Sequence, residues 1–388
     1  MKINKWTLGL AAIGLVSLGS VAQAEEKAVP LMTALSSTTL SGYVDTSAVW
    51  NPGTGNANPA PFAFNGGKQD GFNLNSVDLK LEKALTEDQW AAGYAVELMF
   101  GPDAPAVTGS GFGTSSLVRQ AYVNVRAPLG NGLDFKVGRW DNIIGYESTD
   151  TYKNPNFTHS YAWSLEPTAH TGILASYQAS PQIGLSVGVA NTLTTGFVNG
   201  RAIRGTSVTE TKKAVVSLLT LSAPESWGSL SGSALYVGLD NGFGSTTEDR
   251  THFYVGATVA TPVKGFKVGG SFDSISHMDA GGVDFGYVEA YNLYASFQAT
   301  EKLTVSTRAE YARGANLGTV LGGNAFHRVL ALTGTLDYAL WQNVVSRLEV
   351  RWDHAADGSR PFGGSAASGF APTKKNDLMV AANLVYKF

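Results

Sequence analysis

The sequence predicts an all-β fold: a transmembrane, antiparallel, up-and-down β-barrel of about sixteen strands, with short periplasmic turns and long extracellular loops. Three observations predict it. Apolar and polar side chains alternate along most of the chain, short and long connections take turns, and only 15% of the 388 residues are charged. A soluble domain carries about 25% charged residues. A wall between lipid outside and water inside carries an apolar outer band with aromatic girdles, which accounts for so few charges.

The first 24 residues are expected to be a secretory signal peptide. A basic start precedes a short apolar run at residues 8–16, and residues 22–24 read Ala-Gln-Ala. This run is too short to cross a bilayer as a helix, and small residues in this spacing are typical of a cleavage site. We therefore expect export, a short periplasmic segment at residues 25–37, and an outer-membrane barrel over residues 38–388.

The composition excludes several other classes. The formal net charge of -3, without any basic block, excludes a nucleic-acid-binding protein. The chain has no Cys and therefore no disulfide framework. No apolar run of about 18 residues follows the leader, which excludes an ordinary helical membrane protein. The six His lack metal-ligand spacing, and no phosphate-binding loop or nucleophile elbow is present. We expect no catalytic residues, no metal and no cofactor.

Strands are predicted where apolar side chains recur at every second position, because successive side chains of a strand point to opposite faces. The last segment is the clearest, with apolar residues at every even position from 378 to 388. A tilted strand needs about 9–11 residues to cross the hydrocarbon. The predicted strands are residues 38–50, 72–84, 89–100, 117–127, 132–141, 170–179, 183–191, 212–222, 228–239, 251–260, 265–275, 287–299, 302–313, 326–339, 342–353 and 376–388. Fourteen or eighteen strands are the alternatives.

The connections between these strands alternate in length without exception. Short ones are expected on the periplasmic side and long ones outside, as in bacterial barrels. The long connections are residues 51–71, 101–116, 142–169, 192–211, 240–250, 276–286, 314–325 and 354–375. Because lipid offers no hydrogen-bond partners to a strand edge, the sheet must close on itself.

Tryptophan side chains are predicted at both membrane interfaces, where an indole keeps its ring in apolar surroundings and its N–H in water. Trp90, Trp227 and Trp341 fall at periplasmic strand ends, and Trp50, Trp140 and Trp352 at external ones. Alternation places Arg139 on the lipid side and Trp140 inside. Either a bulge at Gly138 corrects this, or both residues lie above the hydrocarbon.

The last strand carries the pattern of an assembly signal. The chain ends in Phe388, with Tyr386 and Leu384 in phase before it. An exposed edge strand of this kind can be captured by strand addition. We therefore expect the outer-membrane barrel assembly machinery to be a partner.

Several motifs of the first half follow one another in a fixed order. They are Gly101-Pro102-Asp103-Ala104, Arg119-Gln120-Ala121-Tyr122-Val123, Gly132-Leu133-Asp134-Phe135-Lys136-Val137-Gly138-Arg139, Ile144-Gly145-Tyr146-Glu147, Asn154-Pro155-Asn156, Ser160-Tyr161, Glu166-Pro167 and His170-Thr171-Gly172. The block from about Ser41 to Gly188 resembles the OmpL-like β-barrel porins. The resemblance implies an outer-membrane porin that passes small hydrophilic solutes, without catalytic residues and without an assigned solute.

Polar side chains in the inward phase are predicted to line the pore, because Arg or Lys on the lipid face costs about 2–4 kcal/mol at mid-depth. Both signs of charge occur on neighbouring strands, so these groups can pair laterally and leave water in the centre. The candidates are Asp78, Lys80, Glu82, Glu97, Gln120, Asn124, Arg126, Asp134, Lys136, Arg308, Glu310, Asp337, Arg347, Glu349, Arg351 and Asp353. The alternative for any one of them is that it only braces the wall.

The connection 142–169 is the longest and is a candidate for folding into the pore. Loops of this length are usually functional or disordered, and Pro with Trp favours an ordered one. The constriction candidates are Asn154, Pro155, Asn156, Trp163, Glu166 and His170. The alternative is an external cover.

Four functions are open at this point. The leading one is a porin for passive diffusion of small hydrophilic solutes and ions. A substrate-specific channel, for example for oligosaccharides, needs aromatic residues in series along the lumen, and Tyr43, Tyr122 and Tyr254 are inward. A barrel enzyme needs Ser, His and a polar orienting group together, and the pair His159-Ser160 is the nearest candidate. An inert barrel that displays its loops is the fourth.

Partners follow from the predicted location. Outer-membrane lipid should surround the barrel, and a homo-trimer is left open because no interface can be read. Asp279 and Asp284 flank two glycines and could hold Ca²⁺, although a solvated turn is the simpler interpretation.

Overall fold

The computed structural model describes residues 37–53, 57–62, 68, 70–108, 117–191, 213–243, 249–276, 279–280, 283–284, 286–315 and 317–388. The expected signal peptide at residues 1–24 and nearly all of the segment 25–37 lie outside these residues, so both stay predictions.

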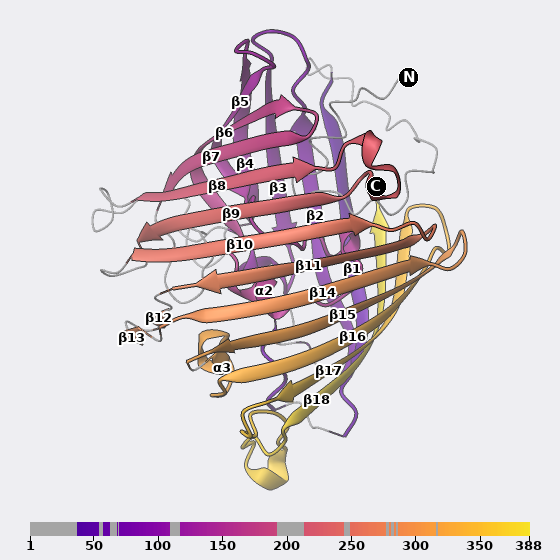
Figure 1. Ribbon diagram of the computed structural model, residues 1–388. Coiled ribbons are helices and arrows are strands. Elements are labelled where there is room, and N and C mark those ends of the chain that lie inside the picture. Colours follow the sequence, from indigo (N-terminus) through magenta and orange to yellow (C-terminus); the bar gives the residue numbers. More distant parts are fainter. Residues whose placement is uncertain are drawn as a thin grey trace.

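Sixteen antiparallel strands close into a barrel in the order β1-β18-β17-β16-β15-β14-β11-β10-β9-β8-β7-β6-β5-β4-β3-β2, which confirms the predicted fold. The strands are β1 (Thr39–Trp50), β2 (Gly71–Lys83), β3 (Ala92–Phe100), β4 (Val118–Ala127), β5 (Leu133–Asp141), β6 (Ala169–Ser180), β7 (Ile183–Asn191), β8 (Lys213–Ser222), β9 (Ala234–Phe243), β10 (Asp249–Ala260), β11 (Phe266–Ile275), β14 (Val288–Gln298), β15 (Leu303–Gly314), β16 (Arg328–Tyr338), β17 (Val344–Ala355) and β18 (Asn376–Lys387). In Figure 1 the C-terminus lies toward the same end as the short turns, and α3, β12 and β13 lie at the opposite end.

Short elements occupy the connections. They are η1 (Ala104–Ala106), η2 (Thr151–Lys153), α2 (Tyr161–Leu165), η3 (Glu225–Leu230), β12 (Asp279–Ala280), β13 (Val283–Asp284), α3 (Leu317–Val320) and η4 (Ala366–Ser368). Asp279 pairs with Asp284 in the small β12–β13 ribbon. Among the described residues, no helix is long and apolar enough to cross a bilayer.

The ninth strand is the one whose expected bounds were wrong. It was expected at residues 228–239 and runs from Ala234 to Phe243. The preceding residues form η3, in which Gly228 has a φ of 59° and breaks any extended path. A glycine adopts this conformation without a steric penalty.

The seam between the first and last strands closes the barrel. Gly42 N–H donates to the carbonyl of Phe388 at 2.9 Å, and Phe388 N–H donates to the carbonyl of Gly42 at 3.0 Å. The pairing continues from Tyr43↔Lys387 to Trp50↔Val380. Because both edges are paired along this line, no row of backbone groups faces the lipid there.

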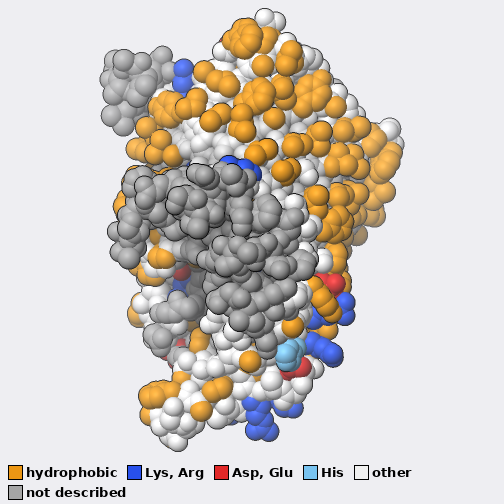
Figure 2. All heavy atoms as spheres, turned by 90° about the vertical axis from the view of Figure 1, so that its left-hand side faces the viewer, with side chains coloured by type: hydrophobic (Ala, Val, Ile, Leu, Met, Phe, Trp, Pro, Cys, Tyr) orange, Lys and Arg blue, Asp and Glu red, His pale blue; other side chains and the backbone are white. Residues whose placement is uncertain are grey.

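Apolar side chains cover the outer wall. They are the alternate residues of each strand that point outward. Leu332, Leu348 and Leu384 are exposed there. Figure 2 shows hydrophobic side chains over the upper part of the molecule and charged ones below them. Exposed Trp90, Trp227, Trp341 and Trp50 lie at strand ends, as an interfacial belt requires.

Trp140 does not belong to this belt. Its side chain is buried inside the barrel against Ala95, Tyr122 and Leu174. Arg139 is buried as well, and its Nη2 donates to the carbonyl of Val107 at 3.0 Å. The strand pairing runs through Gly138 without a register shift, so the expected bulge at this position is wrong.

The bulges lie on neighbouring strands instead. The pairing of β3 with β4 jumps from Glu97↔Gln120 to Leu98↔Val118 and leaves Arg119 as the extra residue. The pairing of β1 with β2 likewise leaves out Asn75. A bulge shifts the alternation by one position, so Arg119 and Asn75 both turn into the barrel, where they are buried.

Candidate functional site

All sixteen pore-lining candidates lie on the face of the wall opposite to the exposed apolar side chains. These candidates form two groups that differ in how far their side chains are buried. Lys80, Glu82, Arg126, Asp134, Lys136 and Asp337 are partly exposed, whereas Asp78, Glu97, Gln120, Asn124, Arg308, Glu310, Arg347, Glu349, Arg351 and Asp353 are buried. The partly exposed group lies near the short turns, so the interior is most open toward the periplasmic end.

The partly exposed charges form one ion pair within β2 and one between β4 and β5. Lys80 Nζ lies 2.8 Å from Glu82 Oε2, and Arg126 Nε lies 2.6 Å from Asp134 Oδ1. Lys136 instead lies over the Tyr122 ring, 4.8 Å from its centroid. The ion pairs near the short turns therefore stabilise the wall, and the exposed parts of their side chains contact water.

The segment 142–168 lies inside the barrel and explains the burial of the other group. Arg347 of β17 donates from Nη1 to the carbonyl of Thr151 at 2.9 Å, and from Nη2 to those of Tyr152 and Asn154 at 2.9 and 2.8 Å. These carbonyls lie more than 190 residues away in the sequence. One guanidinium group therefore fixes a full turn of the segment, η2, against the wall.

Two further arginines hold the next turn of the segment. Arg308 of β15 donates to the carbonyls of Thr158 and His159 at 2.5 and 3.1 Å, and Arg351 of β17 donates to that of His159 at 2.8 Å. Both guanidinium groups are also paired with Glu310, at 2.7 and 3.2 Å. Charge-assisted hydrogen bonds are roughly twice as strong as neutral ones, so this turn is tightly held.

Wall carboxylates accept the backbone N–H groups of the same turn. Glu349 accepts from Phe157 N and Thr158 N at 2.6 and 2.9 Å. Glu310 accepts from Tyr161 N at 2.7 Å, where α2 begins. An anion at a helix N-terminus is favourable. The buried wall charges thus hold the segment in place as well as pairing with one another.

Glu147 is the ionic centre of the segment itself. Its carboxylate accepts from Arg308 Nη1 at 3.1 Å, Tyr294 Oη at 2.8 Å and Ser160 N at 3.0 Å, and lies 2.9 Å from His159 Nδ1. Burial alone would raise the pKa of Glu147, but Arg308 and His159 outweigh it and lower the pKa to about 2. Glu147 is therefore ionised at any ordinary pH.

The pair His159-Ser160 has other roles than a base and its nucleophile. Burial lowers the pKa of His159, whose ring stacks on Trp163 with centroids 4.0 Å apart. The hydroxyl of Ser160 accepts from Trp163 N and caps α2. Both side chains are thus committed to the fold of the segment.

The remaining constriction candidates are spread along the segment and are mostly buried. Asn154 closes a turn with Ser148 at 2.8 and 2.7 Å, followed by half-buried Pro155, and Asn156 donates to Thr335 Oγ1 at 2.7 Å. His170 belongs to β6 and lies 3.2 Å from Asn142 Oδ1. Burial raises the pKa of Glu166, and Asp273 and Glu147 raise it further. Their role in permeation stays a prediction.

Apolar side chains fill the external end of the barrel beside this segment. The cluster joins inward residues of seven strands, such as Val329 and Met379, to Phe62, Tyr161 and Phe362 of the connections. Sequence reasoning missed it, although part of the signal was present: most inward positions near the external ends of β14 to β18 are apolar or small, with Asp353 and Asp377 among them. The cluster therefore packs this part of the interior with apolar side chains.

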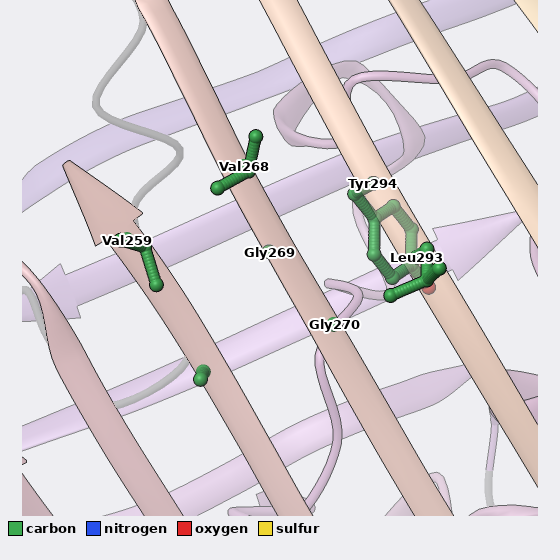
Figure 3. A pocket seen from close by; sticks show the side chains of 7 residues that line it. Val259, Val268, Gly269, Gly270, Leu293 and Tyr294 are labelled. Atoms are coloured by element: carbon green, nitrogen blue, oxygen red, sulfur yellow. The ribbon is translucent and has the colours of Figure 1, made fainter. Parts of the chain in front are cut away.

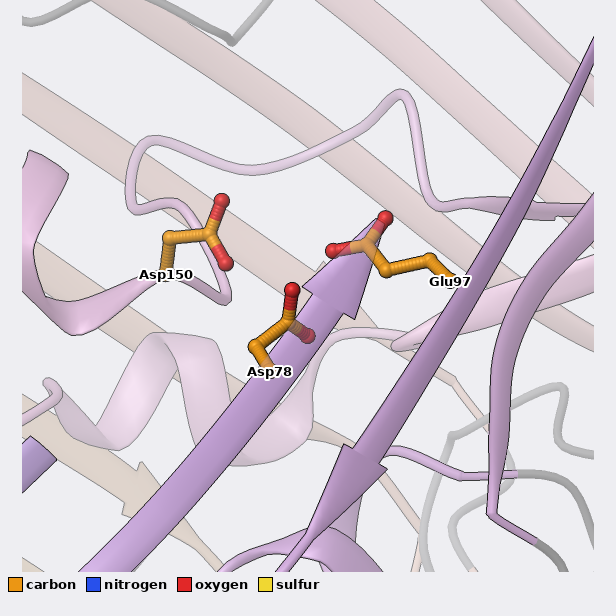
Figure 4. Close-up of side chains that lie close together, drawn as sticks. All are labelled: Asp78, Glu97 and Asp150. Atoms are coloured by element: carbon orange, nitrogen blue, oxygen red, sulfur yellow. The ribbon is translucent and has the colours of Figure 1, made fainter. Parts of the chain in front are cut away.

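Arg119 is one of several buried charged residues that are missing from the pore-lining candidates. Its Nη1 pairs with Glu97 at 2.7 Å, with Asp78 at 3.5 Å and closely with Asp150, while Nη2 pairs with Asp141 at 2.7 Å. Figure 4 shows Asp78, Glu97 and Asp150 turned toward one another. Their oxygens lie within 4.8 Å of one another, a spacing that suits a metal ion. Arg119, however, already supplies the positive charge among them.

Asp150 ties this cluster to the segment inside the barrel. Burial would raise the pKa of Asp150, but Arg119 and Lys153 outweigh it and hold the pKa below its usual range. The neighbouring hydroxyl of Thr151 donates to Asp45 Oδ2 at 2.6 Å. The first turn of the segment is therefore fixed from β1, β4 and β17 together.

The three inward tyrosines do not form an open series along the lumen. Tyr43 packs edge-on against Tyr152, Tyr122 packs with Lys136 and Trp140, and Tyr254 packs with Ile144. All three are buried. Their rings are covered by the protein and are not arranged for stacking on a sugar.

A shallow apolar cavity of about 360 Å³ lies on the barrel wall. Val259, Val268, Gly270 and Leu293 line it, and Figure 3 shows it at the point where β11 carries two glycines in succession. On the inner side, Tyr146 of the segment stacks on Tyr294 with centroids 4.2 Å apart. A Cβ at Gly269 would clash with Oη of Tyr146, so this glycine makes room for the ring.

The comparisons with known proteins point to one family. The family model described as "Putative beta-barrel porin-2, OmpL-like" matches residues 37–388. No curated protein is similar enough in sequence to be matched.

Solved structures share the architecture at low identity. The outer membrane channel DcaP of Acinetobacter baumannii is 14% identical, with 90% of this chain and 97% of that chain covered and a TM-score of 0.56. The anion-selective porin from Comamonas acidovorans is 13% identical, with 91% and 99% covered and a TM-score of 0.58. OmpT of Vibrio cholerae in a trimer form is 13% identical, with 90% and 99% covered and a TM-score of 0.55. Likeness at this identity shows the fold alone.

Proposed function

The chain belongs to the OmpL-like family of β-barrel porins, outer-membrane channels for passive diffusion, and from this premise we propose that its lumen passes small hydrophilic solutes and ions past a constriction formed by residues 142–168. The family assignment covers the whole barrel. The constriction is our own addition to it.

One observation carries the constriction. Arg308, Arg347 and Arg351 each donate to backbone carbonyls between Thr151 and His159. A segment bound through its main chain keeps its path whatever its side chains do. Because it lies within the barrel and is anchored on several strands, it reduces the cross-section that water and solutes can use.

The charges near the short turns give the solute path its polar wall. Lys80, Glu82, Arg126, Asp134 and Asp337 are partly exposed there and alternate in sign. Alternating signs attract the hydration shells of both cations and anions. This supports passage of small hydrophilic solutes rather than of apolar ones.

Deleting residues 154–163 tests the constriction. Single-channel conductance in planar bilayers should rise, because this deletion removes the part of the segment that lies between its contacts with Arg347 and Arg351. Deleting residues 366–369, which lie in the exposed η4 of another connection, is the matched control and should leave conductance at the wild-type value. Unchanged conductance after the first deletion would end the proposal, while the family assignment would stand.

A substrate-specific channel is the second candidate, and graded sugars separate it from the first. A diffusion channel should pass sugars in order of size, without saturation. Saturable current block by one oligosaccharide would favour the specific channel. The burial of Tyr43, Tyr122 and Tyr254 supports the diffusion channel.

We also propose how the chain reaches the membrane and assembles. Residues 1–24 would direct export, and Leu384, Tyr386 and Phe388, which point outward and are exposed, would be recognised by the assembly machinery. The trimer form of OmpT supports a homo-trimer as the assembled state. Cross-linking of the membrane-embedded protein would test this state.

A further inference from the structure

Two arginines face each other on the outside of the barrel. Arg313 of β15 and Arg328, the first residue of β16, are register partners. Both are exposed, and the outward positions that follow Arg328 along β16 are the exposed Leu330 and Leu332. Like charges directly opposite each other destabilise a sheet. Negative charge close to Arg328 would therefore stabilise this pair.

The carboxylates at this edge already have partners, and Glu289 offsets the charge of Arg313. Glu289 Oε2 accepts from Arg313 Nε at 2.7 Å and from Tyr291 Oη at 2.9 Å. Asp357 accepts from His327 N at 2.5 Å and from both the N–H and the hydroxyl of Ser359. Within the described part of the chain, no carboxylate lies at ion-pair distance from Arg328.

The position of the two arginines relative to the membrane follows from the length of β16. From Arg328 to Tyr338 the strand advances by ten residues, roughly 33 Å along its axis. At a tilt of about 40° this corresponds to a height of roughly 25 Å, which is the height of the apolar band of such barrels. Arg328 therefore lies at the external edge of the hydrocarbon, where lipid headgroups begin.

Further cations lie in a neighbouring connection. Arg360, Lys374 and Lys375 are exposed between β17 and β18. Figure 2 shows Lys and Arg side chains, with Asp, Glu and His side chains among them, below the hydrophobic surface of the wall. These basic side chains outnumber the carboxylates of Glu289 and Asp357.

We propose that Arg313 and Arg328 form a binding site for the phosphate headgroup of a membrane lipid. The guanidinium fork matches phosphate oxygens in a bidentate geometry. A phosphate between the two groups would remove their repulsion, and the acyl chains of the same molecule would lie on Leu330 and Leu332. The combination of phosphate and chains selects a lipid over a free anion. The site is independent of the pore, so its failure would leave the channel assignment intact.

Binding of short-chain lipids to the full-length protein in a nonionic detergent tests the site. Dioctanoyl phosphatidic acid should bind on the order of tenfold more tightly than dioctanoylglycerol, because only the former can form charge-assisted hydrogen bonds. The R328Q variant should lose most of this difference, and 0.5 M NaCl should weaken binding to the wild type, since exposed charges are screened. Equal binding of the two lipids would overturn the proposal.

Two variants and one anion complete the experiment. K302Q removes a charge at a periplasmic turn and should bind phosphatidic acid like the wild type. E289Q removes the competing carboxylate and should tighten binding, and a loss of binding in E289Q would contradict the site. Inorganic phosphate should bind far more weakly than the lipid, and equal affinity would overturn the lipid assignment. Heat-dependent mobility of each variant in SDS gels reports that the barrel has folded.

Discussion

Nη1 of Arg308 lies 3.1 Å from Oε1 of Glu147 and joins the barrel wall to the segment that it encloses, across 161 residues of sequence. Both side chains are buried. Removing one partner of a buried ion pair leaves an uncompensated charge and costs about 3–5 kcal/mol. The position of the segment is therefore coupled to the stability of the barrel.

The first prediction concerns pH. The pKa of Glu147 is about 2 in the folded protein, below the value of about 4.3 in an unfolded chain. Its stabilising contribution is thus fully present above about pH 4.3 and is lost as the pH falls toward 2. The free energy of unfolding in urea, measured from pH 6 to pH 2, should fall less steeply for E147Q than for the wild type. Identical slopes would contradict the prediction.

The second prediction concerns the anchor of η2. R347Q removes three donors to the carbonyls of Thr151, Tyr152 and Asn154. Unsatisfied buried groups cost about 1–3 kcal/mol, and the freed turn should raise both the conductance and the current noise of single channels. K302Q at a periplasmic turn should change neither. A quiet R347Q channel of wild-type conductance would show that this anchor is dispensable.

The third prediction concerns Arg119. R119Q leaves Asp78, Glu97 and Asp150 buried together without their cation, so the free energy of unfolding should fall by about 3–5 kcal/mol. R119K keeps the charge but not the planar fork and should recover part of this loss. Urea denaturation followed by tryptophan fluorescence measures both. A fully stable R119Q protein would show that the carboxylates are neutral in the fold.

The fourth prediction concerns the contact of Tyr146 with the wall. G269A places a Cβ against Oη of Tyr146 and displaces the ring from Tyr294. Overpacking typically costs about 1–3 kcal/mol, which should lower the midpoint of thermal unfolding. G334A is the matched control, because a Cβ there meets no atom within 4 Å. Equal midpoints for the two variants would contradict this packing.

The fifth prediction separates assembly from stability at the C-terminus. The backbone of Phe388 pairs with Gly42, and this pairing survives in F388A. Refolded F388A should therefore lie within about 1 kcal/mol of the wild type, as is usual for surface substitutions. Its yield of folded barrel in cells should fall several-fold. Y338A, another exposed aromatic side chain at a strand end, should keep its yield. A normal cellular yield of F388A would show that the side chain of Phe388 is not part of an assembly signal.

The barrel could be predicted from the sequence because alternation and turn lengths are local signals. Leu384, Tyr386 and Phe388 were placed outward by alternation alone, and the structure exposes all three. The error at β9 arose where Gly228 breaks the backbone path, which hydrophobic alternation does not record.

The interior could be predicted only in part. Alternation assigns Arg119 to the lipid face. This assignment fails because a bulge, which the sequence pattern does not reveal, turns the side chain inward. The contacts of Arg347 join residues more than 190 positions apart, and no local pattern encodes such a distance. The apolar inward residues near Val329 and Met379 are visible in the sequence, but which of them meet in one cluster depends on contacts between distant strands.

The seam between β1 and β18 has a consequence for assembly. Thr46 and Leu384, bonded across it, are 338 residues apart, so the earliest strand waits for the latest one before its edge is satisfied. The other barrel strands pair with their neighbours along the chain, so this contact is the one that joins the most distant parts of the sequence. An exported chain can therefore close the ring only after its last strand has reached the membrane, and the free edge of β1 must be protected until then.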